Sequence, residues 1–150
     1  HAVFLDLPIV FSMEDAMAGL MPFAWSDSYQ ARMGVMPRDG TADDLRWFNV
    51  APCYIFHVLN AFEEGDDVVV DAARYGRTWA KAGAFSDGPA RLWRYRLNMK
   101  TGAVSETQLD DVGIEFPRLD ERRAGLINRS GAMSNLQASD PASTRTTPRI

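Results

Sequence analysis

The stretch Cys53-Tyr-Ile-Phe-His-Val-Leu-Asn-Ala-Phe-Glu-Glu-Gly-Asp66 sets one histidine, His57, inside an otherwise apolar segment that ends in an acidic glycine turn. The apolar run predicts a β-strand over 54–62, and glycine beside solvated carboxylates predicts the turn that follows. An imidazole on such a strand needs a partner, because a buried polar group without one costs free energy. The residues alone leave two partners open: a backbone group or water, as for a core histidine, or a metal ion such as iron.

Short strands recur at regular intervals on both sides of this stretch. Alternating side chains predict a strand at the start of the chain and hairpins before, at and after the His57 strand. The predicted strands are 2–11, 31–37, 45–50, 54–62, 68–75, 92–97, 104–109 and 114–119. This spacing indicates an all-β protein, which is a meander, a sandwich or a set of propeller blades.

Three segments do not follow the strand pattern. Residues 13–21 are rich in Ala, Met and Glu, which favours a short helix or an ordered insertion. Residues 76–89 show no clean period and are predicted to be a loop insertion. Residues 130–150 offer little apolar surface, so we expect a disordered or poorly packed tail, either a flexible terminus or a sequence that has left the true reading frame. The predicted domain therefore covers residues 1–129.

Composition and charge exclude several classes of protein. With 46% hydrophobic and 24% charged residues, the 150-residue chain has the composition of a globular domain. A net charge of −4 and scattered basic residues argue against a nucleic-acid partner, because a phosphate-binding surface needs clustered Lys and Arg. No apolar run reaches the roughly 18 residues of a spanning helix. The single cysteine, Cys53, excludes an internal disulfide and favours a reducing compartment.

Several strings of residues, taken together, carry a resemblance to a known family. They are Phe4-Leu-Asp-Leu-Pro8, residues 29–38, Arg46-Trp-Phe48, residues 52–66, Leu109-Asp-Asp111 and residues 115–123. In this order they resemble the carotenoid cleavage oxygenases, which are non-haem iron enzymes. The resemblance implies a fragment of a seven-bladed β-propeller, whose axial iron is held by four histidines from inner strands. His57 matches one of these metal ligands. Glu115, in Ile114-Glu-Phe-Pro-Arg118, matches a glutamate that hydrogen-bonds an iron-ligating histidine.

The resemblance also assigns the strands to blades. Residues 54–62 would form the inner strand of one blade, and the next three predicted strands would follow outward. The strands before residue 54 would belong to the preceding blade, and residue 114 would open the inner strand of the next one. The chain starts at His1 without methionine, so we expect a piece of about two blades from a longer protein. His1 is not expected to be a ligand, because the family's preceding ligand lies before the strand at residues 3–8.

The implied activity is the cleavage of a conjugated C=C bond of a carotenoid or apocarotenoid with O2, in an Fe(II)-dependent reaction that gives carbonyl products. With a single ligand, the isolated chain is expected neither to bind iron tightly nor to turn over substrate. The partners would be an apolar polyene and O2. Trp25, Trp79, Phe85 and Met21 suit a substrate tunnel or a membrane-touching patch, although core packing is the simpler expectation, and the expected location is the cytoplasm or a membrane periphery. Alternatives are a stilbene-type phenylpropanoid dioxygenase and a catalytically inactive interaction module.

Overall fold

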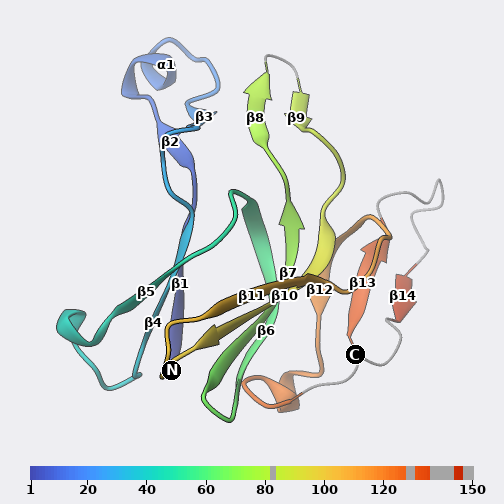
Figure 1. Cartoon of the computed structure of the whole chain (residues 1–150). Helices are drawn as coiled ribbons and strands as arrows, with labels where there is room; N and C mark the ends of the chain where they lie inside the picture. The colour runs from blue at the N-terminus through green and yellow to red at the C-terminus, as the bar shows by residue number, and fades with distance from the viewer. Residues whose placement is uncertain (82–83, 128–130, 136–143, 147–150) are drawn as a thin grey trace.

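The computed structural model consists of β-strands with little helix, as the sequence predicts (Figure 1). It describes residues 1–81, 84–127, 131–135 and 144–146. Within these ranges the helical elements are α1 (Met13–Met17) and the 3₁₀ turns η1 (Ala42–Asp44) and η2 (Glu121–Arg123). No helix in the described ranges is long and apolar enough to cross a membrane. The predicted all-β class is therefore confirmed.

The central sheet is a complete four-stranded antiparallel blade. Its strands are β6 (Tyr54–Glu64), β7 (Asp67–Tyr75), β10 (Arg91–Asn98) and β11 (Val104–Gln108), in the order β11-β10-β7-β6. Gly65 closes the turn between β6 and β7 with a φ of +62°, a conformation that glycine adopts without steric cost. The predicted hairpins and their order outward from the His57 strand are confirmed.

Partial sheets flank this blade. One has the order β1-β4-β5, formed by β1 (Ala2–Asp6), β4 (Arg32–Met36) and β5 (Arg46–Asn49). The other has the order β12-β13-β14, formed by β12 (Ile114–Arg118), β13 (Ala132–Asn135) and β14 (Thr144–Thr146). Figure 1 shows β12 beside the central sheet, where it contacts β6 and β7. The arrangement is that of one whole propeller blade between parts of its two neighbours.

The strands β13 and β14 lie in the 130–150 tail, where the sequence predicts no regular structure. The structure differs there because main-chain hydrogen bonds order these residues through pairing of β13 with β12 and of β14 with β13. Such bonds do not depend on the side-chain period. Residues 130, 136–143 and 147–150 lie outside the described residues, so the expectation for them and the boundary at residue 129 stay predictions.

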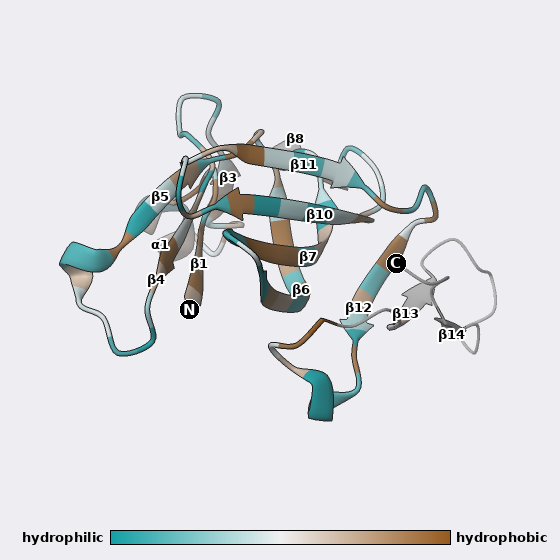
Figure 2. Ribbon diagram, turned by 60° about the horizontal axis from the view of Figure 1, so that its bottom comes forward, coloured by the Kyte–Doolittle hydropathy of each residue, from teal (hydrophilic) through white to brown (hydrophobic). Residues whose placement is uncertain are grey.

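The middle strand β7 separates two apolar cores and is buried on both faces from Val68 to Ala73. Figure 2 shows it as a largely hydrophobic ribbon. One core joins β7 to the β1-β4-β5 sheet and includes Met33, Val35, Phe48, Ile55, Val68, Val70, Ala72, Tyr95 and Leu97. The other lies toward β12 and includes Leu59, Ala73, Tyr75, Ala90, Leu92 and Ile114. Each of the larger aliphatic side chains contributes about 1.5–3 kcal/mol through burial, which anchors β6 and β12 on one support.

Two excursions leave the sheets on the same side of the molecule (Figure 1). The first runs through β2 (Ile9–Phe11), α1 and β3 (Phe23–Trp25). The side chain of Ser12 caps the predicted helix by accepting a hydrogen bond from the Asp15 backbone N–H at 3.2 Å. The strand predicted over 2–11 is therefore split around Pro8, which lacks the N–H that a continuous strand needs.

The second excursion is formed by β8 (Thr78–Lys81) and β9 (Ala84–Ser86). The prediction of a loop over 76–89 is wrong here, because the rings of Trp79 and Phe85 pack 5.5 Å apart and support a short hairpin that has no clean sequence period. Arg77 forms an ion pair with Asp27 at 2.7 Å, and the Phe23 and Trp79 rings lie 5.7 Å apart. These contacts hold the two excursions together.

Candidate metal centre

His57 lies on β6 between two β-bulges. Phe56 and Leu59 have no partner on β7, and the register shifts at each of them. Without a bulge, Ile55 and His57 would share a face, because side chains alternate along a strand. The bulge at Phe56 instead leaves Ile55 in the core shared with the first sheet and turns His57 toward β12.

The His57 ring faces a buried carboxylate on β12. Its Nδ1 atom lies 3.2 Å from Oε1 of Glu115, whose side chain is 6% exposed. Both atoms are buried, and among the described residues neither makes a hydrogen bond, so the 3.2 Å contact is a close approach whose angles are not those of a hydrogen bond. Within the described ranges, Glu115 forms no ion pair with Arg118 on the same strand. Glu115 Oε1 is the acceptor nearest to Nδ1, so a proton on Nδ1 directed at it would give both atoms a partner and leave Nε2 with its lone pair available.

Phe116 contacts the same ring because of its unusual backbone. Its φ is +50°, which residues other than glycine rarely adopt. In a regular strand the side chains of Glu115 and Phe116 would point to opposite faces. The left-handed conformation falls where the β12–β13 register is irregular, and it brings the Phe116 ring to 4.8 Å from that of His57. Such a conformation costs about 1–3 kcal/mol and is typical of functional sites.

Tyr75, at the end of β7, completes the surroundings of Glu115. Burial raises the pKa of Tyr75 to about 12, and the charge of the neighbouring Glu115 adds to the rise. The phenol is therefore neutral at physiological pH and is able to donate a hydrogen bond to an acceptor. The His57 side chain is 43% exposed although its Nδ1 is buried, so the exposed edge is the one that carries Nε2.

An apolar groove begins next to this histidine. Phe56 is the centre of a ring cluster and lies within 5.8 Å of Tyr54, Tyr75, Trp79 and Phe85. The groove has a volume of about 580 Å³ and is lined by apolar and aromatic side chains from β1, β2, β3, β6 and β8 and from the β1–β2 junction. These dimensions suit an apolar small molecule. Phe85 and Met21 are 46% and 61% exposed, so core packing, the simpler expectation, is wrong for both.

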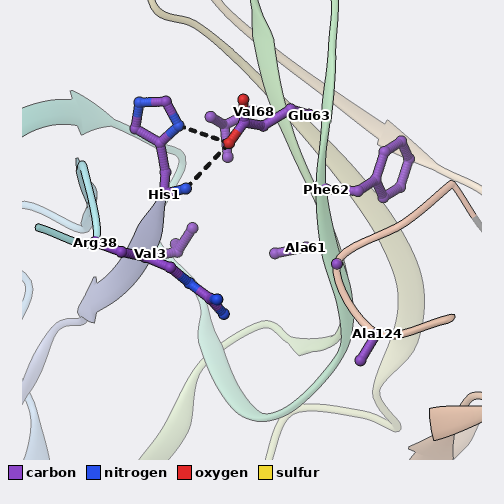
Figure 3. Close-up of a pocket in the computed structure, with 9 residues that line it drawn as sticks. His1, Val3, Arg38, Ala61, Phe62, Glu63, Val68 and Ala124 are labelled. Carbon is purple, nitrogen blue, oxygen red and sulfur yellow. Dashed lines mark hydrogen bonds and ion pairs between the residues drawn. The ribbon is translucent and has the colours of Figure 1, made fainter. Parts of the chain in front are cut away.

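His1 is held elsewhere. Its Nδ1 lies 2.8 Å from Oε1 of Glu63 near the opposite end of β6 (Figure 3). The strand between Glu63 and His57 is roughly 20 Å long at the usual rise per residue. In the part of the chain that the structure describes, no three His, Cys, Asp or Glu side chains gather to hold a metal ion. Among these residues His57 is therefore a lone candidate ligand.

The structure brings together the two residues that the sequence nominates, His57 and Glu115, while their roles stay predictions. Sequence reasoning missed Phe116 and Tyr75. A positive φ at Phe116 is a backbone property that a phenylalanine does not signal, and Tyr75 reaches the site only through the pairing of β7 with β6. The bulges were also missed, because apolar residues on both faces hide a change of register.

Comparisons with known proteins place the chain in a family. The family model for the retinal pigment epithelial membrane protein matches residues 1–147. The carotenoid cleavage oxygenase of Mycobacterium tuberculosis (strain CDC 1551 / Oshkosh) is 42% identical over 115 residues, which cover 73% of this chain and 23% of that protein. The carotenoid 9,10(9',10')-cleavage dioxygenase of Crocus sativus is 37% identical over 132 residues, which cover 81% of this chain and 24% of that protein.

A solved structure shows the same fold. The crystal structure of Pseudomonas brassicacearum lignostilbene dioxygenase superimposes with a TM-score of 0.76 and 29% identity, covering 94% of this chain and 31% of that one. The chain spans about a quarter of the length of the curated relatives it matches. Its blade and partial blades are a fragment of a seven-bladed β-propeller. The chain belongs to the retinal pigment epithelial membrane protein family, that of the carotenoid cleavage oxygenases.

Proposed function

We propose that the full-length protein is an Fe(II)-dependent oxygenase that cleaves a conjugated C=C bond of a carotenoid or apocarotenoid. One O2 is consumed per double bond, and each carbon of that bond becomes a carbonyl carbon. The observation that supports this most directly is the contact of His57 Nδ1 with the buried Glu115 carboxylate, beside an apolar groove. The curated relatives, which are carotenoid cleavage enzymes, supply the substrate class.

The donor set of the chain fits one quarter of a site made of histidines. A ligating imidazole usually donates its other N–H to a carboxylate, which fixes the tautomer and raises the basicity of the ligating nitrogen. In this chain the buried Nδ1 of His57 and Oε1 of Glu115 lie 3.2 Å apart and have no hydrogen-bond partner among the described residues, so Glu115 is the carboxylate placed to accept that proton. Fe(II), when bound, supplies the redox chemistry with O2.

The remaining residues of the site act on the substrate and on the ligand. Glu115 holds the His57 ring in one orientation, and the Phe116 ring limits its rotation from one face. The aromatic groove around Phe56 binds the apolar chain of the substrate and excludes water from the double bond that reacts. The three further ligands would come from other inner strands of the propeller.

Metal affinity of the full-length protein tests the proposal. The Fe(II) dissociation constant, measured by competition with a chelator, is expected to rise about 10- to 100-fold in Glu115→Gln and by more than this in His57→Ala. Glu63→Gln is the matched control, because Glu63 is an exposed glutamate on the same strand. An unchanged dissociation constant in His57→Ala would contradict the role of this histidine.

The likeness to lignostilbene dioxygenase is the observation that supports the stilbene-type alternative. We prefer the carotenoid class because the curated carotenoid enzymes are 37% and 42% identical, compared with 29% for that structure. Incubation of the iron-loaded full-length protein with an apocarotenal and, separately, with a hydroxystilbene decides between them. Cleavage of the hydroxystilbene alone would replace the carotenoid proposal. If the full-length protein neither binds iron nor cleaves either compound, the remaining alternative is a catalytically inactive interaction module.

For the isolated 150-residue chain, we propose that iron binds weakly and that no substrate is turned over, because His57 is a single donor. Stoichiometric iron on a monomer of this chain would contradict that.

We also propose a cytoplasmic protein that touches a membrane through the α1 excursion. Its apolar side chains Phe11, Met13, Met17, Leu20 and Met21 are 55–83% exposed. Flotation with liposomes is expected to fall in Met17→Glu but not in the control Lys100→Glu.

A further inference from the structure

Asn60 connects the strand of His57 to the loop that follows β12. This residue is 6% exposed. Its Nδ2 donates to the carbonyl oxygen of Leu126 at 2.9 Å, and its Oδ1 accepts from the N–H of Gly125 at 3.1 Å. A carboxamide that uses both its donor and its acceptor on adjacent residues fixes the register and the direction of that segment. Asn60 itself is buried, although the loop residues that it bonds are exposed, so replacing Asn60 would remove the two directed bonds that tie this loop to β6.

The second bulge of β6 makes this contact possible. Positions 57 and 60 are three residues apart, so regular alternation would place their side chains on opposite faces of the sheet. The extra residue at Leu59 restores them to one face. His57 pairs with Ala73 and Asn60 with Asp71, and these two positions of β7 lie on the same face. Ala73 belongs to the core that faces β12, so both β6 side chains are directed toward the next blade.

The loop that Asn60 holds belongs to the same hairpin as Glu115. It joins β12 to β13 and passes through η2 to Gly125, whose φ of +77° presents its N–H to Asn60. Figure 3 shows Ala124 on this loop beside β6, and together they line part of a pocket of about 360 Å³. The hairpin therefore meets β6 at two points, one at His57 and one at Asn60.

No main-chain ladder joins the two strands among the described residues, because β6 and β12 belong to different sheets. One main-chain hydrogen bond, from the Ile114 N–H to the Ala90 carbonyl at 2.9 Å, ties the start of β12 to the central blade, and side-chain contacts act together with it to set the position of β12 relative to β6. We call the two hydrogen bonds from the Asn60 carboxamide to Gly125 and Leu126 the Asn60 clamp. Both bonds are directional, whereas apolar packing between the blades is not. The clamp is thus well suited to determine how close Glu115 lies to His57.

We propose that Asn60 is a positioning residue of the metal centre: its carboxamide holds the β12–β13 hairpin so that the Glu115 carboxylate stays within hydrogen-bond distance of His57 Nδ1. The inference rests on the proposed function of His57 as an iron ligand. With the clamp in place, Glu115 holds the ring with Nε2 directed outward. Without it, the hairpin shifts, the ring turns more freely, and the metal is bound less tightly.

A double-mutant cycle in the full-length protein tests the inference. Fe(II) dissociation constants are measured for Asn60→Leu, for Glu115→Gln and for the double variant, together with the visible spectrum of each protein loaded with Co(II). Asn60→Leu is expected to raise the dissociation constant about 10-fold and to alter the Co(II) spectrum. The double variant is expected to match Glu115→Gln within about twofold, because both changes act on one contact.

Asn98→Leu is the matched control. Asn98 also uses both its carboxamide donor and acceptor, since its Nδ2 donates to Asp67 and its Oδ1 accepts from the N–H groups of Lys100 and Thr101, but it lies at the end of β10, away from His57. It should lower stability without changing metal affinity or the Co(II) spectrum. Gly125→Ala disturbs the same contact from the side of the loop, because alanine is strained at the positive φ of this position. It replaces Asn60→Leu in the test if that variant does not fold.

The outcomes separate the inference from the function on which it rests. If Asn60→Leu and Gly125→Ala keep the wild-type dissociation constant and spectrum while Glu115→Gln weakens binding, the clamp does not position the ligand and the inference is overturned. An additive loss in the double variant overturns it as well, because Asn60 would then act independently of Glu115. If His57→Ala also binds Fe(II) normally, the proposed function itself fails.

Discussion

β6 and β7 are neighbours in one blade and are built in opposite ways. β7 pairs with β10 without interruption from Asp67 to Arg74, and every side chain from Val68 to Ala73 is buried. β6 breaks its register with β7 twice and leaves Phe56, His57 and Val58 partly exposed. The regular strand supplies stability, whereas the bulged strand uses that support to direct chosen side chains.

The difference shows how a propeller blade separates stability from chemistry. A strand in a continuous ladder must alternate its side chains, so it cannot aim residues 57 and 60 at the same neighbour. Each bulge on β6 loses ladder hydrogen bonds, and the loss is tolerated because β7 is held on its other edge and on both faces. Substitutions in the two strands should therefore change different measured quantities.

Breaking the buried ion pair of β7 should have the largest effect on stability. Asp71 accepts two hydrogen bonds of 2.8 Å from Arg94 and has a side chain that is 3% exposed. Asp71→Leu leaves the Arg94 charge without its partner, so we expect a loss of about 3–5 kcal/mol in the free energy of unfolding of the full-length protein. Chemical denaturation measures it. Recovery in the double variant Asp71→Leu/Arg94→Leu identifies the unpaired charge as the cause, and a loss that persists there would point to packing instead.

Truncation of a core side chain should have the next largest effect on stability, and the loss should be larger in β7 than in β6. Val70, on β7, has no exposed surface, whereas Val58, on β6, is 41% exposed. We expect Val70→Ala to lose about 1–3 kcal/mol of unfolding free energy and Val58→Ala to stay within about 0.5 kcal/mol. Thermal or denaturant unfolding of both variants provides the test. Equal losses would show that β6 shares the structural role of β7.

Phe56 should affect function more than stability. It lies outside the β6–β7 ladder and at the centre of the ring cluster beside His57. Phe56→Leu keeps an apolar side chain but removes its aromatic contacts, each of which contributes about 0.5–1.5 kcal/mol. We expect the KM for an apocarotenoid to rise several-fold with a smaller change in kcat, measured on the iron-loaded full-length protein. A change in iron content without a change in KM would instead connect Phe56 to the metal.

The smallest effect concerns alkaline pH at the end of β7. An unfolded tyrosine has a pKa of about 10, whereas that of Tyr75 in the folded protein is raised to about 12. The folded state therefore favours the neutral phenol, and the resulting stability is present below pH 10 and is lost as the pH rises from 10 to 12. Tyr75→Phe should lose less stability than wild type over that range, as measured by unfolding at several pH values. If the free energies of unfolding of the two proteins fall in parallel between pH 10 and 12, the raised pKa of Tyr75 is contradicted.

Much of the fold was predictable from local patterns. Alternating apolar residues located the strands of the central blade, and glycine with carboxylates located the β6–β7 turn. The β8–β9 hairpin was not predictable, because it depends on contacts between Trp79 and Phe85 rather than on a period. The strands β13 and β14 were missed for a similar reason, since main-chain pairing with β12 orders them.

The candidate site divides in the same way. His57 and Glu115 were predicted from the sequence because the residues around each of them resemble motifs of the carotenoid cleavage oxygenases. Phe116, Tyr75 and Asn60 were not, since each reaches the site through a bulge, a positive φ or a contact between separate sheets. Such features depend on where other strands pack.

By itself the sequence determined the all-β class and the order of the hairpins, because these follow from periods of two along a strand. It identified His57 as a candidate iron ligand and Glu115 as its carboxylate through the resemblance of their surroundings to the carotenoid cleavage oxygenases. Only the tertiary structure decided which face of β6 carries His57 and Asn60, and how close Glu115 comes. The physical reason is that a bulge changes the direction of a side chain without changing the residues. The distance between strands of different sheets is set by packing between blades, which no local pattern encodes.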